Sequence, residues 1–162
     1  MKFRERGYIT VEELMKLNLI PPIERIKKGP VAIAECPEKI PCNICVDACP
    51  FNAISMNSIN DIPRIDWNKC TGCTVCVTSC PGLAIFVVDL SKGEKGYVTL
   101  PYEFLPEPKK GMKVDLLNRK GEVVDEGVIV KAYSRNRVWA VTVEVPSDKV
   151  MEVRAIWVRK RE

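Results

Sequence analysis

A run of four regularly spaced cysteines constrains the fold of this chain more than any other feature. The run ends in proline and consists of Cys70, Cys73, Cys76, Cys80 and Pro81. Three thiols at three-residue spacing lie around one metal centre, whereas the fourth thiol reaches a different metal centre. A run of this kind therefore predicts a second, paired run elsewhere in the chain.

The second run lies upstream and repeats the first with an offset of 31 residues. Its members are Cys42, Cys45, Cys49 and Pro50. The similarity extends past the prolines, because Ala53 and Ile54 match Ala84 and Ile85. Such an internal repeat indicates two copies of one small unit, packed about a pseudo-twofold axis.

This cysteine spacing is typical of two-[4Fe–4S] ferredoxins, in which the last cysteine of each run ligates the other cluster. Lys39 stands where the repeat requires the counterpart of Cys70, and the remaining cysteine is Cys36. We interpret Cys36 as the displaced ligand, which uses all eight cysteines. If its thiol cannot reach the iron, the first site becomes a three-iron cluster or loses its metal.

The crossed pattern assigns the eight cysteines to two [4Fe–4S] clusters. The first set of ligands is Cys36, Cys42, Cys45 and Cys80. The second set is Cys70, Cys73, Cys76 and Cys49. Two zinc sites are an alternative, because pairs of cysteines at this spacing also bind zinc. Four disulfides are less consistent with a chain that shows no signal peptide.

Composition excludes several classes of function. The formal net charge of +4 is too small to indicate binding to nucleic acid. Residues 31–90 carry three basic and six acidic residues, whereas both flanking segments are basic. The absence of histidine removes the commonest general base, and no apolar run is long enough for a membrane span. We expect a cytoplasmic protein without catalytic residues of its own.

Four segments are expected along the chain. They are an N-terminal arm at 1–30, a ferredoxin domain at 31–100, a proline-rich linker at 101–110 and a small β domain at 111–162. Thr10 and Glu13 have capping-box spacing and predict a short helix in the arm, which ends before a basic turn at 25–29. The predicted fold class is α+β, with a pseudo-twofold doubled βαβ unit and a C-terminal antiparallel β-barrel or sandwich.

Apolar side chains near the cysteines are expected to form the core and to keep water from the clusters. They are Ile40, Ile44, Val46, Phe51, Ile54, Val75, Val77, Leu83 and Ile85. Gly72 and Gly82 are candidates for close approach of backbone N–H groups to sulfur. In the C-terminal segment we expect Trp139 and Trp157 in the core, and Arg159, Lys160 and Arg161 in solvent.

The chain also resembles a narrower family over most of its length. The segments that carry this resemblance are 7–14, 28–32, 35–43, 80–89 and 101–106. They are similar to the ferredoxin-like small subunits of multisubunit FAD-dependent dehydrogenases, such as dye-linked L-proline, sarcosine-oxidase-like and glycerol-3-phosphate dehydrogenases. In that family the wide spacing between Cys36 and Cys42 is itself typical.

The resemblance implies a non-catalytic electron-transfer subunit in a hetero-oligomer, with FAD and substrate held by flavoprotein partners. An alternative is a subunit of a hydrogenase or of a 2-oxoacid oxidoreductase, which would carry out the same electron transfer in a different complex. A zinc-binding interaction module is the alternative from a different class. An enzyme in its own right is disfavoured, because no nucleotide-binding loop and no spare thiol is present.

Overall fold

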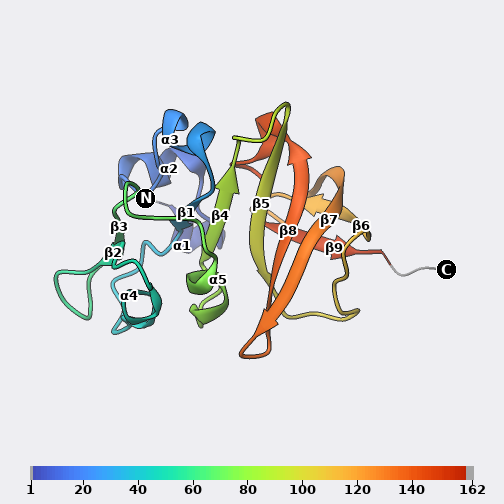
Figure 1. Cartoon of the computed structure of the whole chain (residues 1–162). Coiled ribbons are helices and arrows are strands. Elements are labelled where there is room, and N and C mark those ends of the chain that lie inside the picture. The colour runs from blue at the N-terminus through green and yellow to red at the C-terminus, as the bar shows by residue number, and fades with distance from the viewer. Residues whose placement is uncertain (1, 160–162) are drawn as a thin grey trace.

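The computed structural model describes residues 2–159, so Lys160 and Arg161 of the expected basic tail lie outside the described residues. Figure 1 shows the helices and small strands of the first half on one side and the long C-terminal strands on the other. The helices are α1 (Phe3–Arg6), α2 (Val11–Lys16), α3 (Ile23–Lys28), α4 (Ile44–Ala48), α5 (Val75–Ser79) and the 3-10 turn η1 (Ser147–Lys149). The strands are β1 (Val31–Ala34), β2 (Ile54–Ser55), β3 (Arg64–Ile65), β4 (Ile85–Asp89), β5 (Lys95–Tyr102), β6 (Lys113–Leu117), β7 (Val123–Arg135), β8 (Val138–Pro146) and β9 (Ala155–Val158).

The repeat in the sequence is visible in the structure. Helices α4 and α5 are related by the 31-residue offset, and so are the strands that follow them, β2 and β4. Each helix ends at a cysteine in extended conformation, with ψ of 109° at Cys49 and 115° at Cys80. Asn52 and Leu83, again 31 residues apart, both adopt positive φ angles of 49° and 52°. Because β2 pairs with β3 and β4 pairs with β1, the doubled ferredoxin-like unit is present.

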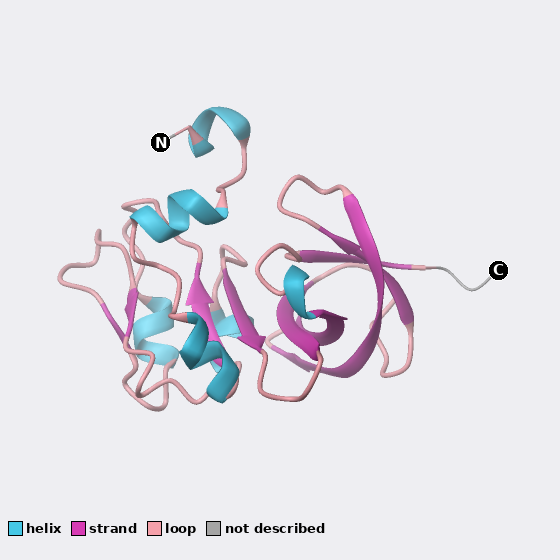
Figure 2. Ribbon diagram, turned by 90° about the horizontal axis from the view of Figure 1, so that it is seen from above, coloured by secondary structure: helices cyan, strands magenta, loops and turns pink. Residues whose placement is uncertain are grey.

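A single antiparallel sheet connects this unit to the rest of the chain. Its strand order is β1-β4-β5-β8-β7-β6-β9, so β4 continues through β5 into the C-terminal strands. The predicted closed barrel is therefore wrong: within residues 2–159, β9 pairs only with β6 and β1 only with β4, and no ladder closes the sheet. Figure 2 shows how strongly the C-terminal strands curve.

Strand β7 is longer than the sequence suggests. A glycine inside a strand pattern usually weakens or interrupts the strand, but β7 runs through Gly127 without a break. A Cβ at this position would lie 2.7 Å from the Glu144 backbone oxygen and 2.8 Å from Leu116, so a glycine is needed for close approach of the strands. A register shift between Ile129 and Lys131 bends the strand further on.

The N-terminal arm packs against the ferredoxin-like unit. Leu14 is fully buried and forms a cluster with Leu19 and Ile62, which lies between the cysteine runs. The predicted capping box is confirmed, since the Thr10 hydroxyl accepts from the Glu13 N–H and the Glu13 carboxylate accepts from the Thr10 N–H. The basic turn predicted at 25–29 is wrong, because residues 23–28 form helix α3 directly after Pro22.

Other expectations about burial and extent are also corrected. Trp157 is 63% exposed because β9 is an edge strand whose outer face meets solvent. Ile40, Ile44 and Phe51 are each nearly half exposed, so they form part of the surface near the cysteines instead of the core. Pro101 does not begin a linker but lies within β5, beyond the residues of that strand that pair with β4.

Candidate metal centre

The first quartet of cysteines surrounds one cavity. The quartet consists of Cys36, Cys42, Cys45 and Cys80. Its members come from the loop after β1, from helix α4 and from the end of helix α5. Ile40, Pro63, Gly82 and Ile85 also line this cavity, so its wall is largely apolar.

The second quartet surrounds a separate cavity of similar construction. It consists of Cys49, Cys70, Cys73 and Cys76. Cys49 comes from the end of α4, and the other three thiols come from the downstream run, Cys70–Cys80. Ala53 and Ile54 line this cavity, whereas their repeat equivalents Ala84 and Ile85 line the first. The two cavities are thus built by equivalent parts of opposite repeats.

The crossing depends on the cysteines that end the two helices. Because Cys49 and Cys80 leave the helical conformation, each thiol turns away from its own run and enters the other cavity. The N–H of Ala53 donates to the Cys49 sulfur at 3.3 Å, and the N–H of Ala84 donates to the Cys80 sulfur at 3.5 Å. These matched hydrogen bonds hold both thiols in equivalent orientations.

Cys36 lies with the first quartet, whereas Lys39 is exposed and does not line the cavity. Asp61 also lines this cavity, which the cysteine spacing did not indicate. Its carboxylate accepts from the Ile62 N–H at 2.7 Å, and this hydrogen bond holds the pKa of Asp61 below its usual range. The first cavity therefore has an ionised carboxylate in its wall.

Burial keeps the deepest thiols protonated in the metal-free chain. Desolvation, together with the neighbouring thiols, raises the pKa of Cys45 to about 11 and that of Cys76 to about 12. Since metal ligation requires thiolates, cluster assembly must release these protons. Assembly is therefore expected to become easier as the pH rises towards these pKa values.

The donor set fits an iron–sulfur core. Each cavity offers four sulfur atoms in a largely apolar environment, which is the usual environment of a cubane cluster. All eight cysteines are free thiols. Between residues 2 and 159, no three Cys, Asp or Glu side chains are grouped closely enough to hold a single metal ion. When bound, such clusters supply one-electron transfer without a proton donor or nucleophile from the protein.

Arg25 connects helix α3 to the downstream run, Cys70–Cys80, a contact that the sequence did not indicate. Its guanidinium donates to the carbonyls of Trp67 and Cys70, both at 2.7 Å, and to that of Gly29 at 3.0 Å. Gly72 packs nearby with a φ of 68°, and a Cβ there would lie 2.6 Å from Pro30. Gly72 also lines the second cavity, so its expected approach to sulfur stays a prediction, and its close packing on Pro30 is a further reason for glycine here.

Contacts from the C-terminal strands also reach the cysteine loops. The Thr74 hydroxyl, between Cys73 and Cys76, shares a hydrogen bond with the Tyr133 hydroxyl of β7. The Glu35 carboxylate, next to Cys36, accepts from Arg154 at 2.7 Å and from Arg119 at 2.5 Å. The downstream run and the loop that carries Cys36 are therefore both fixed to the C-terminal part of the molecule.

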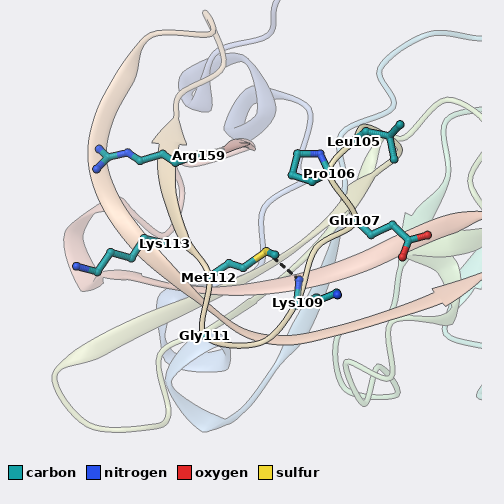
Figure 3. A pocket seen from close by; sticks show the side chains of 8 residues that line it. All are labelled: Leu105, Pro106, Glu107, Lys109, Gly111, Met112, Lys113 and Arg159. Carbon is teal, nitrogen blue, oxygen red and sulfur yellow. Dashed lines mark hydrogen bonds between the residues drawn. The ribbon is translucent and has the colours of Figure 1, made fainter. Parts of the chain in front are cut away.

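A larger groove lies elsewhere on the C-terminal part. Figure 3 shows its lining of Leu105, Pro106, Glu107, Lys109, Gly111, Met112, Lys113 and Arg159. The loop between β5 and β6 forms one wall, and Arg159 lies on the other side. The groove contains no cysteine. Its lining includes Leu105, which is 84% exposed, and three cationic side chains, those of Lys109, Lys113 and Arg159.

Comparison with known proteins supports the nature of the cysteine region. Residues 38–84 match the family model of the 4Fe–4S dicluster domain, which implies two [4Fe–4S] clusters. This part of the chain is therefore a ferredoxin-like electron-transfer domain. No curated protein and no solved structure gave a significant match. No helix within residues 2–159 has both the length and the apolar character needed to cross a bilayer.

Proposed function

We propose that this chain is the iron–sulfur subunit of a larger oxidoreductase, in which it relays single electrons between a partner flavoprotein and an acceptor. The observation that carries the proposal is that the eight thiols gather as two quartets, each drawn from both runs. We assign the first quartet to cluster one and the second quartet to cluster two. A flavin gives up two electrons, and two one-electron centres can accept them in succession.

For the partner, we favour an FAD-dependent dehydrogenase of the L-proline type. The support is the resemblance of the segments around both cysteine runs and of residues 101–106 to the small subunits of such complexes. A hydrogenase or 2-oxoacid oxidoreductase context is the second candidate. Isolation of the native complex, followed by a flavin assay and dye-linked oxidation of proline and glycerol 3-phosphate, separates these contexts.

Metal analysis provides the first test of the cluster assignment. We expect roughly eight iron and eight acid-labile sulfide per anaerobically purified chain, because two cubanes require that number. The preparation should be brown and should become paramagnetic after reduction with dithionite. About two zinc ions and no sulfide would instead identify a zinc-binding module.

We further propose that the β5–β6 loop is a docking surface for the flavoprotein. Phe104 is 66% exposed and Leu105 is 84% exposed, and Lys109 and Lys113 flank this apolar pair. Exposed apolar side chains with cations at their rim suit a partner face with an apolar centre and acidic surroundings.

Leu105→Asp should weaken co-purification with the flavoprotein by at least tenfold while leaving the iron content unchanged. The reason is that a carboxylate replaces the most exposed apolar side chain of the loop without affecting the core. Val123→Asp is a matched control, since Val123 is also an exposed apolar residue but lies at the start of β7. Equal co-purification of both variants with the flavoprotein would contradict a docking role for this loop.

A further inference from the structure

The two quartets differ in the positive charge that lies next to them. The half-buried Arg25 guanidinium is 2.7 Å from the carbonyl oxygen of Cys70, a ligand of the second quartet. Hydrogen bonds to Trp67, Gly29 and Pro30 hold the guanidinium in this position. A cation is therefore fixed against the backbone of cluster two.

Both quartets receive backbone hydrogen bonds at sulfur. In the second quartet, the N–H of Ala32 donates to the Cys70 sulfur at 3.4 Å and that of Ala53 donates to the Cys49 sulfur at 3.3 Å. In the first quartet, the N–H of Ala84 donates to the Cys80 sulfur at 3.5 Å, and the Glu38 backbone is hydrogen-bonded to the Cys36 thiol. Hydrogen bonds to sulfur therefore do not separate the two quartets, and the difference between them is one of charge.

The walls of the two cavities differ in negative charge. Asp61 lines the first cavity, with the exposed Lys39 as a neighbouring cation. The residues that line the second cavity include no carboxylate.

Two arginines also lie near the first quartet, but they bind another carboxylate. Arg119 and Arg154 donate to Glu35, so part of their charge is neutralised there. Neither of them donates to a ligand carbonyl in the way that Arg25 does.

The Arg25 cation at the second quartet and the Asp61 carboxylate at the first act in the same direction. Reduction adds one negative charge to a cluster, so nearby cations and N–H donors favour the reduced form and nearby carboxylates oppose it. We propose that cluster two has the higher reduction potential and that Arg25 is the positioning residue that raises it. This inference rests on the proposed function. With both clusters bound, one electron from the partner's reduced flavin would pass from cluster one to cluster two, where Arg25 would stabilise the added negative charge.

The test is a redox titration of the full-length, cluster-loaded chain, followed by electron paramagnetic resonance. The wild type should show two one-electron midpoint potentials. Arg25→Met should lower the higher potential and leave the lower one nearly unchanged, while Arg25→Lys should retain part of the difference. Lys27→Met removes a cation from the same helix, but its side chain is 58% exposed and pairs with Glu24, so neither potential should move.

A shift of the lower potential in Arg25→Met, or of neither, would overturn the proposal. If Arg25→Met loses iron, the Asp61→Asn variant provides the test instead. It should raise the lower potential only. A rise in the higher potential would contradict the assignment of the higher potential to cluster two. Failure of this inference can be distinguished from failure of the proposed function. If the proposed function is wrong, the wild-type chain lacks eight irons and shows no pair of midpoint potentials to compare.

Discussion

Cys36→Ala should reduce the iron content from roughly eight to about seven per chain and convert cluster one into a three-iron form. The reason is that Cys36 lines the first cavity with the other three thiols of that quartet, while the lysine at the symmetric position is exposed. Cluster two should keep its resonance signal, since none of its four thiols is changed. Iron and sulfide analysis together with resonance spectra of the oxidised chain measures this effect.

Two further variants show whether the effect is specific to the thiol. Lys39→Ala should retain about eight irons, because Lys39 contributes no atom to the cavity wall. If Cys36→Ala also keeps eight irons, another group must replace the thiol, and Asp61 is the carboxylate in that wall. The double variant Cys36→Ala/Asp61→Asn then identifies the substitute, and eight irons in this variant would disprove the ligand assignment.

Features determined by residues close in sequence could be predicted from the chain. The three-residue spacing places thiols on one side of a short turn, and the capping box at Thr10 involves neighbours only. The strands Val31–Ala34, Lys113–Leu117 and Ala155–Val158 each coincide with a short apolar or alternating run of the sequence. The 31-residue repeat predicted the doubled unit, and residues 38–84 match the dicluster domain.

Features that depend on distant contacts could not be predicted in this way. Whether a set of strands closes into a barrel depends on pairings between remote segments, and the curved sheet here remains open. Arg25 and Cys70 are 45 residues apart, and nothing in the local pattern distinguishes Arg25 from the other cations of α3. Exposure of Ile40 and Phe51 was missed for another reason: apolar character alone does not require burial.

Glu35→Gln should destabilise the cluster-loaded chain by about 3–5 kcal/mol, the usual cost of removing one partner from a buried ion pair. The Arg154 side chain is 5% exposed and that of Arg119 is 10% exposed, so neither guanidinium can recover its hydration when the carboxylate is lost. Desolvation already lowers the pKa of Arg154, and the Glu35 charge offsets that cost. Anaerobic denaturation, followed by loss of cluster absorbance, measures the change as a lower denaturant midpoint.

Glu38→Gln is the matched control, because Glu38 also pairs with an arginine close to Cys36. Its partner Arg4 is 70% exposed, so the change should cost less than about 1 kcal/mol. Combining Glu35→Gln with Arg119→Met and Arg154→Met should recover part of the lost stability, since no uncompensated charge then remains buried. Because Glu35 precedes Cys36 and joins it to the C-terminal strands, cluster one should be lost before cluster two in the single variant. Simultaneous loss of both clusters would show that the ion pair supports the whole sheet and not the Cys36 loop.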